Sequence, residues 1–410
     1  ILGVFDFTFL MAFPNRVFGI MTNQNLLAVP LFIFMGLILE KTKIAENLLK
    51  AMNKIYNNTS GGYAISVVIV GALMGASTGI VGASVVTLGL LSIPVMIKNN
   101  YPKDLTCGVI CASGTLGQII PPSLVLILLA DVLSSAYQQA QLNMGMFSPE
   151  TVTIAELFAG AVIPGILLPI LYIFYIKLFH NNLKTDFDKS HEVNLYSSFI
   201  PPILLILLVL GAIILGIATP SEAAALGVLG AIVISTVQKQ LNSNVLNNCS
   251  RETIKLTSMI FMILIGATLF SLVFRGLNGE EAVQSLLLND SLDKFYILLI
   301  VLFLMFLLGF ILDFIEIIFI VIPIFGPILF TLGFDPVWIG ILIGMILQTS
   351  FLTPPFGFSI FYLRGVTPNN IDTKEIYKGV FPFVIIQLSV VMLIILIPEL
   401  ATMLPNIIFN

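Results

Sequence analysis

Two proline pairs lie deep inside apolar stretches of this chain, and each interrupts a segment that otherwise has the composition of one membrane-spanning helix. Pro121-Pro122 lies in the stretch 104–130, and Pro354-Pro355 lies in the stretch 336–362. A proline pair removes two backbone N–H donors and disfavours helix in the preceding residue. Non-helical backbone survives at membrane depth only where protein or a polar cavity surrounds it. The two pairs therefore predict two buried, irregular segments.

The composition indicates a membrane protein. Hydrophobic residues make up 58% of the 410 residues and charged residues only 10%, whereas a soluble globular chain carries about 25% charged residues. So much apolar surface cannot be hidden in a soluble fold. We therefore predict an all-α, polytopic membrane protein that lies in the lipid bilayer.

The surroundings of the two breaks repeat along the chain. The offsets are 230 (266 − 36), 229 (323 − 94) and 233 (354 − 121) for Gly36 and Gly266, Pro94 and Pro323, and Pro121 and Pro354. Each copy contains an interrupted apolar hairpin (63–97 and 294–330) followed by a broken helix (104–130 and 336–362). Paired, interrupted segments at matching positions of two halves are typical of secondary transporters and point to the binding site.

Apolar runs predict eight full spans, near 25–39, 104–130, 157–176, 197–217, 222–238, 254–274, 336–362 and 379–402. Each hairpin, re-entrant or fully spanning, returns the chain to its starting face. With these crossings, 15 of the 18 basic residues share one face, and only Arg16, Arg275 and Lys294 lie opposite. Short cytoplasmic loops carry the Lys/Arg excess. We therefore predict an outer C-terminus and two hairpins of opposite orientation, which makes the copies an inverted repeat.

These segments divide the chain into five predicted parts. They are the end of a truncated N-terminal region (1–24), the first inverted repeat (25–130), connecting spans with a hydrophilic cytoplasmic link (131–253), the second inverted repeat (254–362) and a C-terminal span (363–410). The chain begins at Ile1, and its first residues have the composition of the tail of a span. This pattern predicts that an N-terminal piece is missing.

The hairpin tips and the breaks together predict a cation site in each copy. Na⁺ is ligated by oxygen, which hydroxyls and unwound carbonyls supply. The predicted cation-binding residues of the first copy are Gly75, Ser77, Thr78, Gly79, Ser84, Gly117 and Pro121. Those of the second copy are Gly309, Asp313, Ser350, Thr353 and Pro354. The alternative is that the proline pairs only kink helices for packing.

Helix N-termini at the breaks predict an anionic substrate. Free N–H groups and the positive end of the helix dipole favour negative charge. The predicted substrate-binding residues are Pro122, Ser123, Pro355 and Gly357. Substrate would then lie between the two cation sites.

Asp313 and Glu316 are acids inside an apolar stretch. A carboxylate at the bilayer midplane costs about 2.5–3.5 kcal/mol, so such groups usually pair, protonate or bind ions. A structural carboxylate bonded to backbone amides is the alternative for Asp313. Glu222, by contrast, follows Thr219-Pro220 in the pattern of a helix start, and we interpret it as mainly structural.

Several function classes find no support in the sequence. There is no nucleotide-binding loop of the Walker type, so transport would draw on an ion gradient. The three cysteines are scattered, so we expect no metal or redox cofactor besides Na⁺ as the coupling ion. An aspartyl protease needs two carboxylates that share a proton, and Asp131 lies at a span end. We therefore predict no enzymatic activity, and no nucleic-acid partner.

Five segments resemble, in order, the large membrane subunit of tripartite ATP-independent periplasmic (TRAP) transporters. They are NLLAVPLFIFMG (25–36), GTLGQIIPPS (114–123), TPSEAA (219–224), GFDP (333–336) and LTPPFG (352–357). The resemblance extends over essentially the whole chain. It implies a Na⁺-driven elevator in the bacterial inner membrane, in which a scaffold holds a mobile transport domain made of both hairpins and both broken helices.

The resemblance also implies partners and a substrate class. The partners are a small four-helix membrane subunit and a soluble periplasmic substrate-binding protein, and the substrate is a small organic acid. The chain departs from the family at the first hairpin tip, where Ala76-Ser77-Thr78-Gly79 replaces a Ser-Gly-Ser type sequence. Asp313 with Glu316 resembles a branch with less typical substrates. A stand-alone Na⁺/carboxylate symporter that needs no binding protein is the alternative function.

Overall fold

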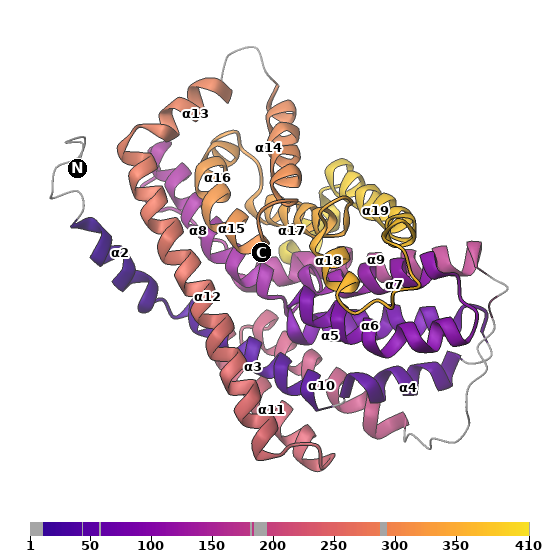
Figure 1. The fold of residues 1–410 in the computed structure, drawn as a ribbon. Helices are drawn as coiled ribbons and strands as arrows, with labels where there is room; N and C mark the ends of the chain where they lie inside the picture. Colours follow the sequence, from indigo (N-terminus) through magenta and orange to yellow (C-terminus); the bar gives the residue numbers. More distant parts are fainter. Residues whose placement is uncertain are drawn as a thin grey trace.

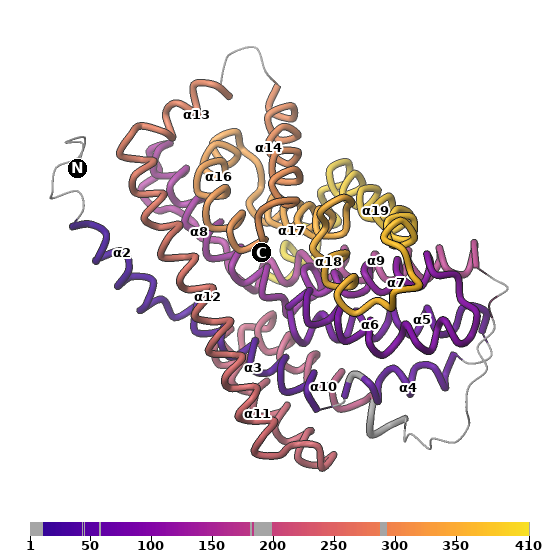
Figure 2. Tube along the Cα trace, in the orientation of Figure 1, coloured from indigo at the N-terminus to yellow at the C-terminus, as the bar shows by residue number. Residues whose placement is uncertain are grey.

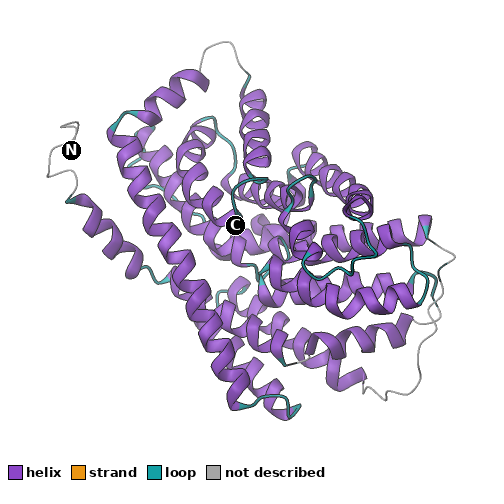
Figure 3. Cartoon of the chain, viewed as in Figure 1, coloured by secondary structure: helices purple, strands orange, loops and turns teal. Residues whose placement is uncertain are grey.

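The computed structural model describes residues 11–42, 44–56, 59–180, 183, 195–287 and 293–409. Every regular element in these ranges is a helix (Figure 3), which confirms the predicted all-α class. The first ten residues and most of the predicted hydrophilic link (177–195) lie outside the described residues.

The helices before the link are α2 (Ala12–Met21), η1 (Asn25–Leu27), α3 (Ala28–Lys41), α4 (Ile44–Tyr56), α5 (Gly62–Thr78), α6 (Val81–Lys98), α7 (Lys103–Thr115), η2 (Leu116–Gln118), α8 (Leu124–Asn143) and α9 (Ile154–Phe179). Those after it are α10 (Leu195–Ile214), α11 (Pro220–Val237), α12 (Ser243–Gly276), α13 (Gly279–Leu287), α14 (Lys294–Leu308), α15 (Phe314–Glu316), η3 (Ile317–Val321), α16 (Ile322–Thr331), α17 (Pro336–Leu352), α18 (Phe358–Arg364), α19 (Thr373–Leu396) and α20 (Glu399–Phe409).

Six of the described helices are long and apolar enough to cross a membrane, or seven if the bent pair α2 and η1–α3 counts as one span. Eight crossings were predicted. The numbers differ partly because the proline pairs split two predicted spans into α7 with α8 and α17 with α18. The last predicted span, 379–402, corresponds to α19, which is one of the six but ends at Leu396, before α20 begins beyond Pro398.

Capping residues set several helix starts. Thr219 lies at the N-cap of α11, where its hydroxyl accepts a hydrogen bond from the Glu222 N–H at 3.3 Å. The Glu222 carboxylate in turn accepts one from the Thr219 N–H at 2.8 Å. This reciprocal pair satisfies N–H groups that have no partner inside the helix, which confirms the structural interpretation of Glu222.

The long helix α12 runs along one side of the molecule, with α2 beside it (Figure 1). Only 22% of its most apolar stretch is buried, as expected of a helix that faces lipid. Helix α3 packs against α11 and α12, and α4 packs against α5 and α10. We call α3, α11 and α12 the flank of the molecule.

The broken helices lie in the core. All residues of α17 except Pro336 are buried, and so are 11 residues of α7. The two halves of the chain interlock around them: α6 of the first hairpin packs on α18, and α16 of the second hairpin packs on α8 (Figure 2). Protein therefore encloses the first irregular segment, as expected of non-helical backbone in a membrane, whereas the second is exposed at Pro355 and Phe356.

Candidate functional site

The first break separates η2 from α8 at residues 119–123. Pro121 and Pro122, joined by a cis peptide bond, have no N–H to offer to the carbonyls of Gly117 and Gln118. The Ser123 hydroxyl donates to the Gln118 carbonyl at 2.7 Å. The Gly117 carbonyl accepts no hydrogen bond from the described residues. One backbone oxygen at this break is therefore left for another partner.

The second break separates α17 from α18 at residues 353–357. Pro355 offers no N–H to the Phe351 carbonyl, which accepts instead from the Ser359 hydroxyl at 2.9 Å. The Ser350 carbonyl, which Pro354 leaves free, accepts from the Thr353 N–H at 3.2 Å. In both breaks a serine hydroxyl thus replaces the donor lost to the second proline.

The first hairpin turns between α5 and α6 at Gly79, whose φ of +61° suits glycine. The hydroxyls of Ser77 and Thr78 both donate to the Met74 carbonyl, at 2.9 and 3.0 Å. The Thr78 hydroxyl also lies 3.1 Å from the Ser84 hydroxyl. All three hydroxyl-bearing residues are buried, so the tip is a neutral cluster of oxygen atoms.

This tip touches the first break mainly through backbone atoms. A Cβ added at Gly75 would lie 2.5 Å from the Gly117 nitrogen and 2.6 Å from its Cα. A Cβ at Gly79 would lie 3.0 Å from the Leu124 nitrogen, at the start of α8. We call the approach of Gly75 to Gly117 the first contact. Only glycine permits it.

The flank helix α3 closes the tip from the other side. A Cβ at Gly36 would lie 2.6 Å from the Thr78 Cα. One turn further along α3, the Glu40 carboxylate accepts from the Thr87 hydroxyl of α6 at 3.1 Å. Its second oxygen is buried without a partner among the described residues. This hydrogen bond between Glu40 and the hairpin was not predicted, because the sequence does not indicate which helix an acid at the end of a span will contact.

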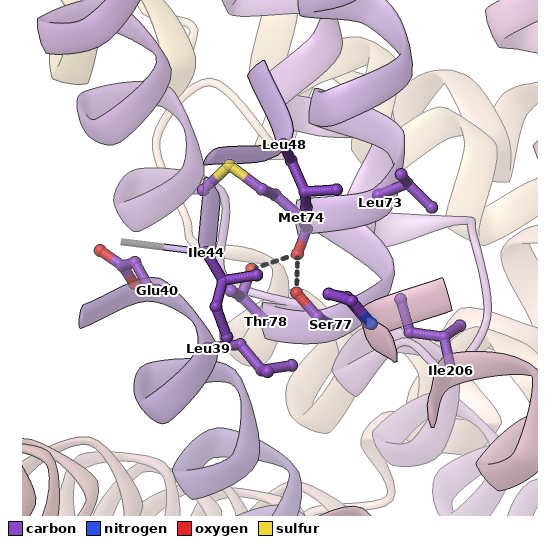
Figure 4. Close-up of a pocket in the computed structure, with 10 residues that line it drawn as sticks. Leu39, Glu40, Ile44, Leu48, Leu73, Met74, Ser77, Thr78 and Ile206 are labelled. Atoms are coloured by element: carbon purple, nitrogen blue, oxygen red, sulfur yellow. Dashed lines mark hydrogen bonds between the residues drawn. The ribbon is translucent and has the colours of Figure 1, made fainter. Parts of the chain in front are cut away.

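A small cavity of about 20 Å³ lies between this flank and the tip, lined among others by Glu40, Met74, Ser77 and Thr78. Figure 4 shows the hydroxyls of Ser77 and Thr78 turned toward the Met74 carbonyl. This volume holds about one water molecule or ion.

The second hairpin contains α14, the loop 309–313, α15, the π-helical turn η3 and α16. Asp313 is the N-cap of α15, and its carboxylate accepts from the Phe314 N–H at 2.7 Å. The Glu316 carboxylate accepts from the Asp313 N–H at 3.1 Å. The two acids thus bind backbone amides, as in the structural alternative for Asp313. Cation binding by Asp313 stays a prediction.

The second hairpin tip touches α17 just before its break. A Cβ at Gly309 would collide with the Ser350 hydroxyl and lie 2.7 Å from the Ser350 Cβ. The Ser350 hydroxyl donates to the Leu347 carbonyl at 2.8 Å. We call the approach of Gly309 to Ser350 the second contact. It joins a glycine to a side chain, whereas the first contact joins backbone to backbone.

The predicted site residues thus fall into two groups, one at each break. The first group comprises Gly75, Ser77, Thr78, Gly79, Ser84, Gly117, Pro121, Pro122 and Ser123, all of them buried. The second group comprises Gly309, Asp313, Ser350, Thr353, Pro354, Pro355 and Gly357, of which Pro355 is exposed. Helix α17 contacts both η2 and α7, so the two broken helices adjoin.

Two buried glutamines were missed by the sequence analysis. Gln118 and Gln348 are fully buried, and neither amide oxygen nor nitrogen of either has a hydrogen-bond partner among the described residues. Gln348 lies near the Tyr172 hydroxyl, which accepts from the Gln387 amide at 2.7 Å. The available signal was a polar amide inside an apolar stretch, each within six residues of a proline pair.

Comparison with known proteins agrees with this architecture. The family model of the tripartite ATP-independent periplasmic transporter, DctM component, matches residues 2–400. The C4-dicarboxylate TRAP transporter large permease protein DctM of Rhodobacter capsulatus is 28% identical over 403 residues, which cover 95% of this chain and 89% of that protein. The protein of the same name from Pseudomonas aeruginosa is 28% identical over 396 residues, with 95% and 88% covered.

A solved structure shares the fold. The YdaH transporter of Alcanivorax borkumensis superposes with a TM-score of 0.68 at 14% sequence identity, and the match covers 98% of this chain and 89% of that one. At this identity the likeness concerns the fold alone. Since the family model spans nearly the whole sequence, this multi-pass membrane chain belongs to the DctM-component family of tripartite ATP-independent periplasmic transporters.

Proposed function

We propose that this chain is the permease subunit of a Na⁺-coupled importer of a small organic acid in the bacterial inner membrane. A periplasmic binding protein delivers the acid, and a small membrane subunit completes the complex. The observation that carries this proposal is the pairing of two proline breaks with two hairpin tips, each at a glycine that leaves no room for a side chain.

Na⁺ is a co-transported substrate in this proposal, and the donor set at the first break suits it. The Gly117 carbonyl and the Gln118 amide oxygen have no hydrogen-bond partner among the described residues. The Thr78 and Ser84 hydroxyls belong to the adjoining tip. Neutral oxygens of this kind are the ligands that unwound helices offer to Na⁺. At the second break, Asp313 adds a negative charge.

The organic acid would bind between the breaks. Helix α8 begins at Leu124, directly after the first break, and the N-terminus of a 20-residue helix attracts a carboxylate through its free N–H groups and its dipole. Pro122 and Ser123 then lie beside the acid, with Pro355 and Gly357 on the opposite side.

An elevator movement accounts for the packing. The hairpins and broken helices interlock, since α6 packs on α18 and α16 packs on α8. The flank of α3, α11 and α12 meets this body mainly through the first hairpin and η3. The interlocked body would carry the site across the membrane while the flank stays in place.

Uptake into proteoliposomes tests the proposal. The purified complex is offered labelled organic acids, including succinate, with and without an inward Na⁺ gradient and with and without the binding protein. We expect uptake only when both the Na⁺ gradient and the binding protein are present. Uptake with Na⁺ alone would establish the stand-alone symporter instead, and Na⁺-independent uptake would refute the coupling.

A further inference from the structure

A second cavity, distinct from the breaks, lies between α2, α8, α12 and the second hairpin. Its volume is about 290 Å³, close to the lower end of the range for small-molecule sites. The lining includes Arg16, Asp131, Gln139, Ser271 and Arg275.

The two arginines stand out among the basic residues. The predicted topology places Arg16 and Arg275 on the outer face, opposite the cytoplasmic Lys/Arg excess. Arg16 lies on α2 and Arg275 near the end of α12, and both line this cavity. The cavity thus brings together two charges of the same sign from two helices.

Only one of these arginines has a close partner of opposite charge. The Arg275 Nε lies 2.5 Å from the Glu280 carboxylate. The Glu280 carboxylate attracts the Arg16 guanidinium only from a longer distance. Arg16 forms no ion pair or hydrogen bond with any residue that the structure describes. Because a guanidinium group keeps its charge, a bound anion would stabilise the half-buried Arg16.

The remaining polar groups leave room for that anion. One oxygen of the Asp131 carboxylate accepts a hydrogen bond from the Asn23 amide at 2.9 Å. The Ser271 hydroxyl lies one turn before Arg275 on the same face of α12, and it forms no hydrogen bond with a described residue. A free guanidinium and a free hydroxyl therefore face the same cavity.

We propose that this cavity binds a small carboxylate or sulfonate, held by the Arg16 guanidinium and the Ser271 hydroxyl. A guanidinium group binds a carboxylate through two parallel N–H donors, and the volume fits a molecule of a few carbon atoms. The role of this site as an outer vestibule for the imported acid rests on the proposed function. The binding itself does not.

Cysteine labelling tests the binding without transport. The native cysteines Cys107, Cys111 and Cys249 are buried, so a cysteine introduced as Gln139→Cys reports on the cavity. The full chain in nanodiscs is treated with two methanethiosulfonate reagents of similar size, one carrying a sulfonate and one a trimethylammonium group. Rates are normalised to those of a free thiol. Ser148→Cys, at an exposed loop position, is the control.

We expect the anionic reagent to be favoured about tenfold more at Gln139→Cys than at Ser148→Cys, because the Arg16 guanidinium attracts an anionic reagent and repels a cationic one. Added Arg16→Gln should abolish this preference. Succinate should slow the labelling of Gln139→Cys, and uncharged succinamide should not. Arg16→Lys should keep the preference but lose most of the protection by succinate, because an ammonium group lacks the paired donors of guanidinium.

Equal preferences at the two positions, or a preference that Arg16→Gln leaves unchanged, would overturn the proposal. Protection by an acidic binding protein but not by succinate would also overturn it, and would identify a docking surface instead. Labelling needs neither Na⁺ nor uptake. Its failure therefore leaves the Na⁺-coupled import intact, and a failure of Na⁺-coupled uptake leaves the anion site intact.

Discussion

The two hairpin contacts are built alike but differ in what touches what. At the first contact, Gly75 meets the backbone of Gly117 within a fully buried, neutral cluster of oxygens. At the second contact, Gly309 meets the side chain of Ser350, and the loop beyond it carries the acids Asp313 and Glu316. The first tip also contacts the flank, where Gly36 packs against the Thr78 backbone.

This difference indicates two kinds of site. Backbone moves aside less readily than a side chain, so the first contact restricts the positions of the Gly117 carbonyl and the tip hydroxyls. A serine side chain can rotate, so the second contact is more adaptable. We therefore expect a rigid, neutral site at the first contact and a more adaptable, charged site at the second. Variants at each contact can test this difference.

Gly75→Ala is expected to have the largest effect. Its methyl group would overlap the Gly117 backbone, and overpacking of this kind costs about 3 kcal/mol. We expect a lower thermal unfolding midpoint and no measurable Na⁺-driven uptake. Gly266→Ala on α12, where no atom lies within 4 Å of the new methyl, is the matched control and should keep both. Normal uptake by Gly75→Ala would contradict a rigid first contact.

Ser123→Ala and Ser359→Ala test whether the two breaks are held in the same way. Among the described residues, each serine is the only donor to a buried carbonyl freed by proline, and an unpaired buried acceptor costs about 2 kcal/mol. Chemical denaturation of both variants should give similar losses. Ser389→Ala, an exposed serine that bonds within its own helix, should change little. A loss at one break alone would show that the breaks are stabilised differently.

Gly309→Ala is expected to cost about 1 kcal/mol, less than Gly75→Ala, because its methyl meets a side chain. Combined with Ser350→Gly, the cost should be smaller than the sum of the single variants, because the side chain that the new methyl would meet is gone. A double-mutant cycle by thermal unfolding measures this coupling. Additive changes in unfolding free energy would mean that the two residues do not interact.

Asp313→Asn should have the smallest effect on stability, a few tenths of a kcal/mol, because asparagine is as good an N-cap as aspartate. If the charge also holds Na⁺, the Na⁺ concentration for half-maximal uptake should rise about tenfold. Asp313→Ala, which loses the cap as well, should cost about 1 kcal/mol in stability. An unchanged Na⁺ dependence in Asp313→Asn would leave only the capping role.

The sequence predicted the positions of the breaks well, because proline acts locally. The helix ends at Gln118 and Leu352 follow from the proline pairs that come three and two residues later. The end of α19 before Pro398 rests on the same signal, which the predicted end of the last span at 402 overlooked. Thr219 with Glu222 was also readable as a local helix start.

Other features depend on contacts between distant segments and could not be predicted. Gly36 carries no local sign that it faces Thr78, 42 positions away (78 − 36). The bond from Thr87 to Glu40 and the isolated amides of Gln118 and Gln348 become visible only once the helices are packed. The inverted-repeat relation of the two halves stays a prediction from the positions of their charges.

Thermal unfolding of the purified chain in Na⁺ or K⁺ at equal ionic strength tests the central claim most directly. A ligand that binds only the folded state raises the unfolding midpoint. If the breaks and hairpin tips bind Na⁺, Na⁺ should raise the midpoint by about 2 °C or more above its value in K⁺. Gly75→Ala should lose most of that difference. Equal midpoints in the two salts for the unaltered chain would contradict the account.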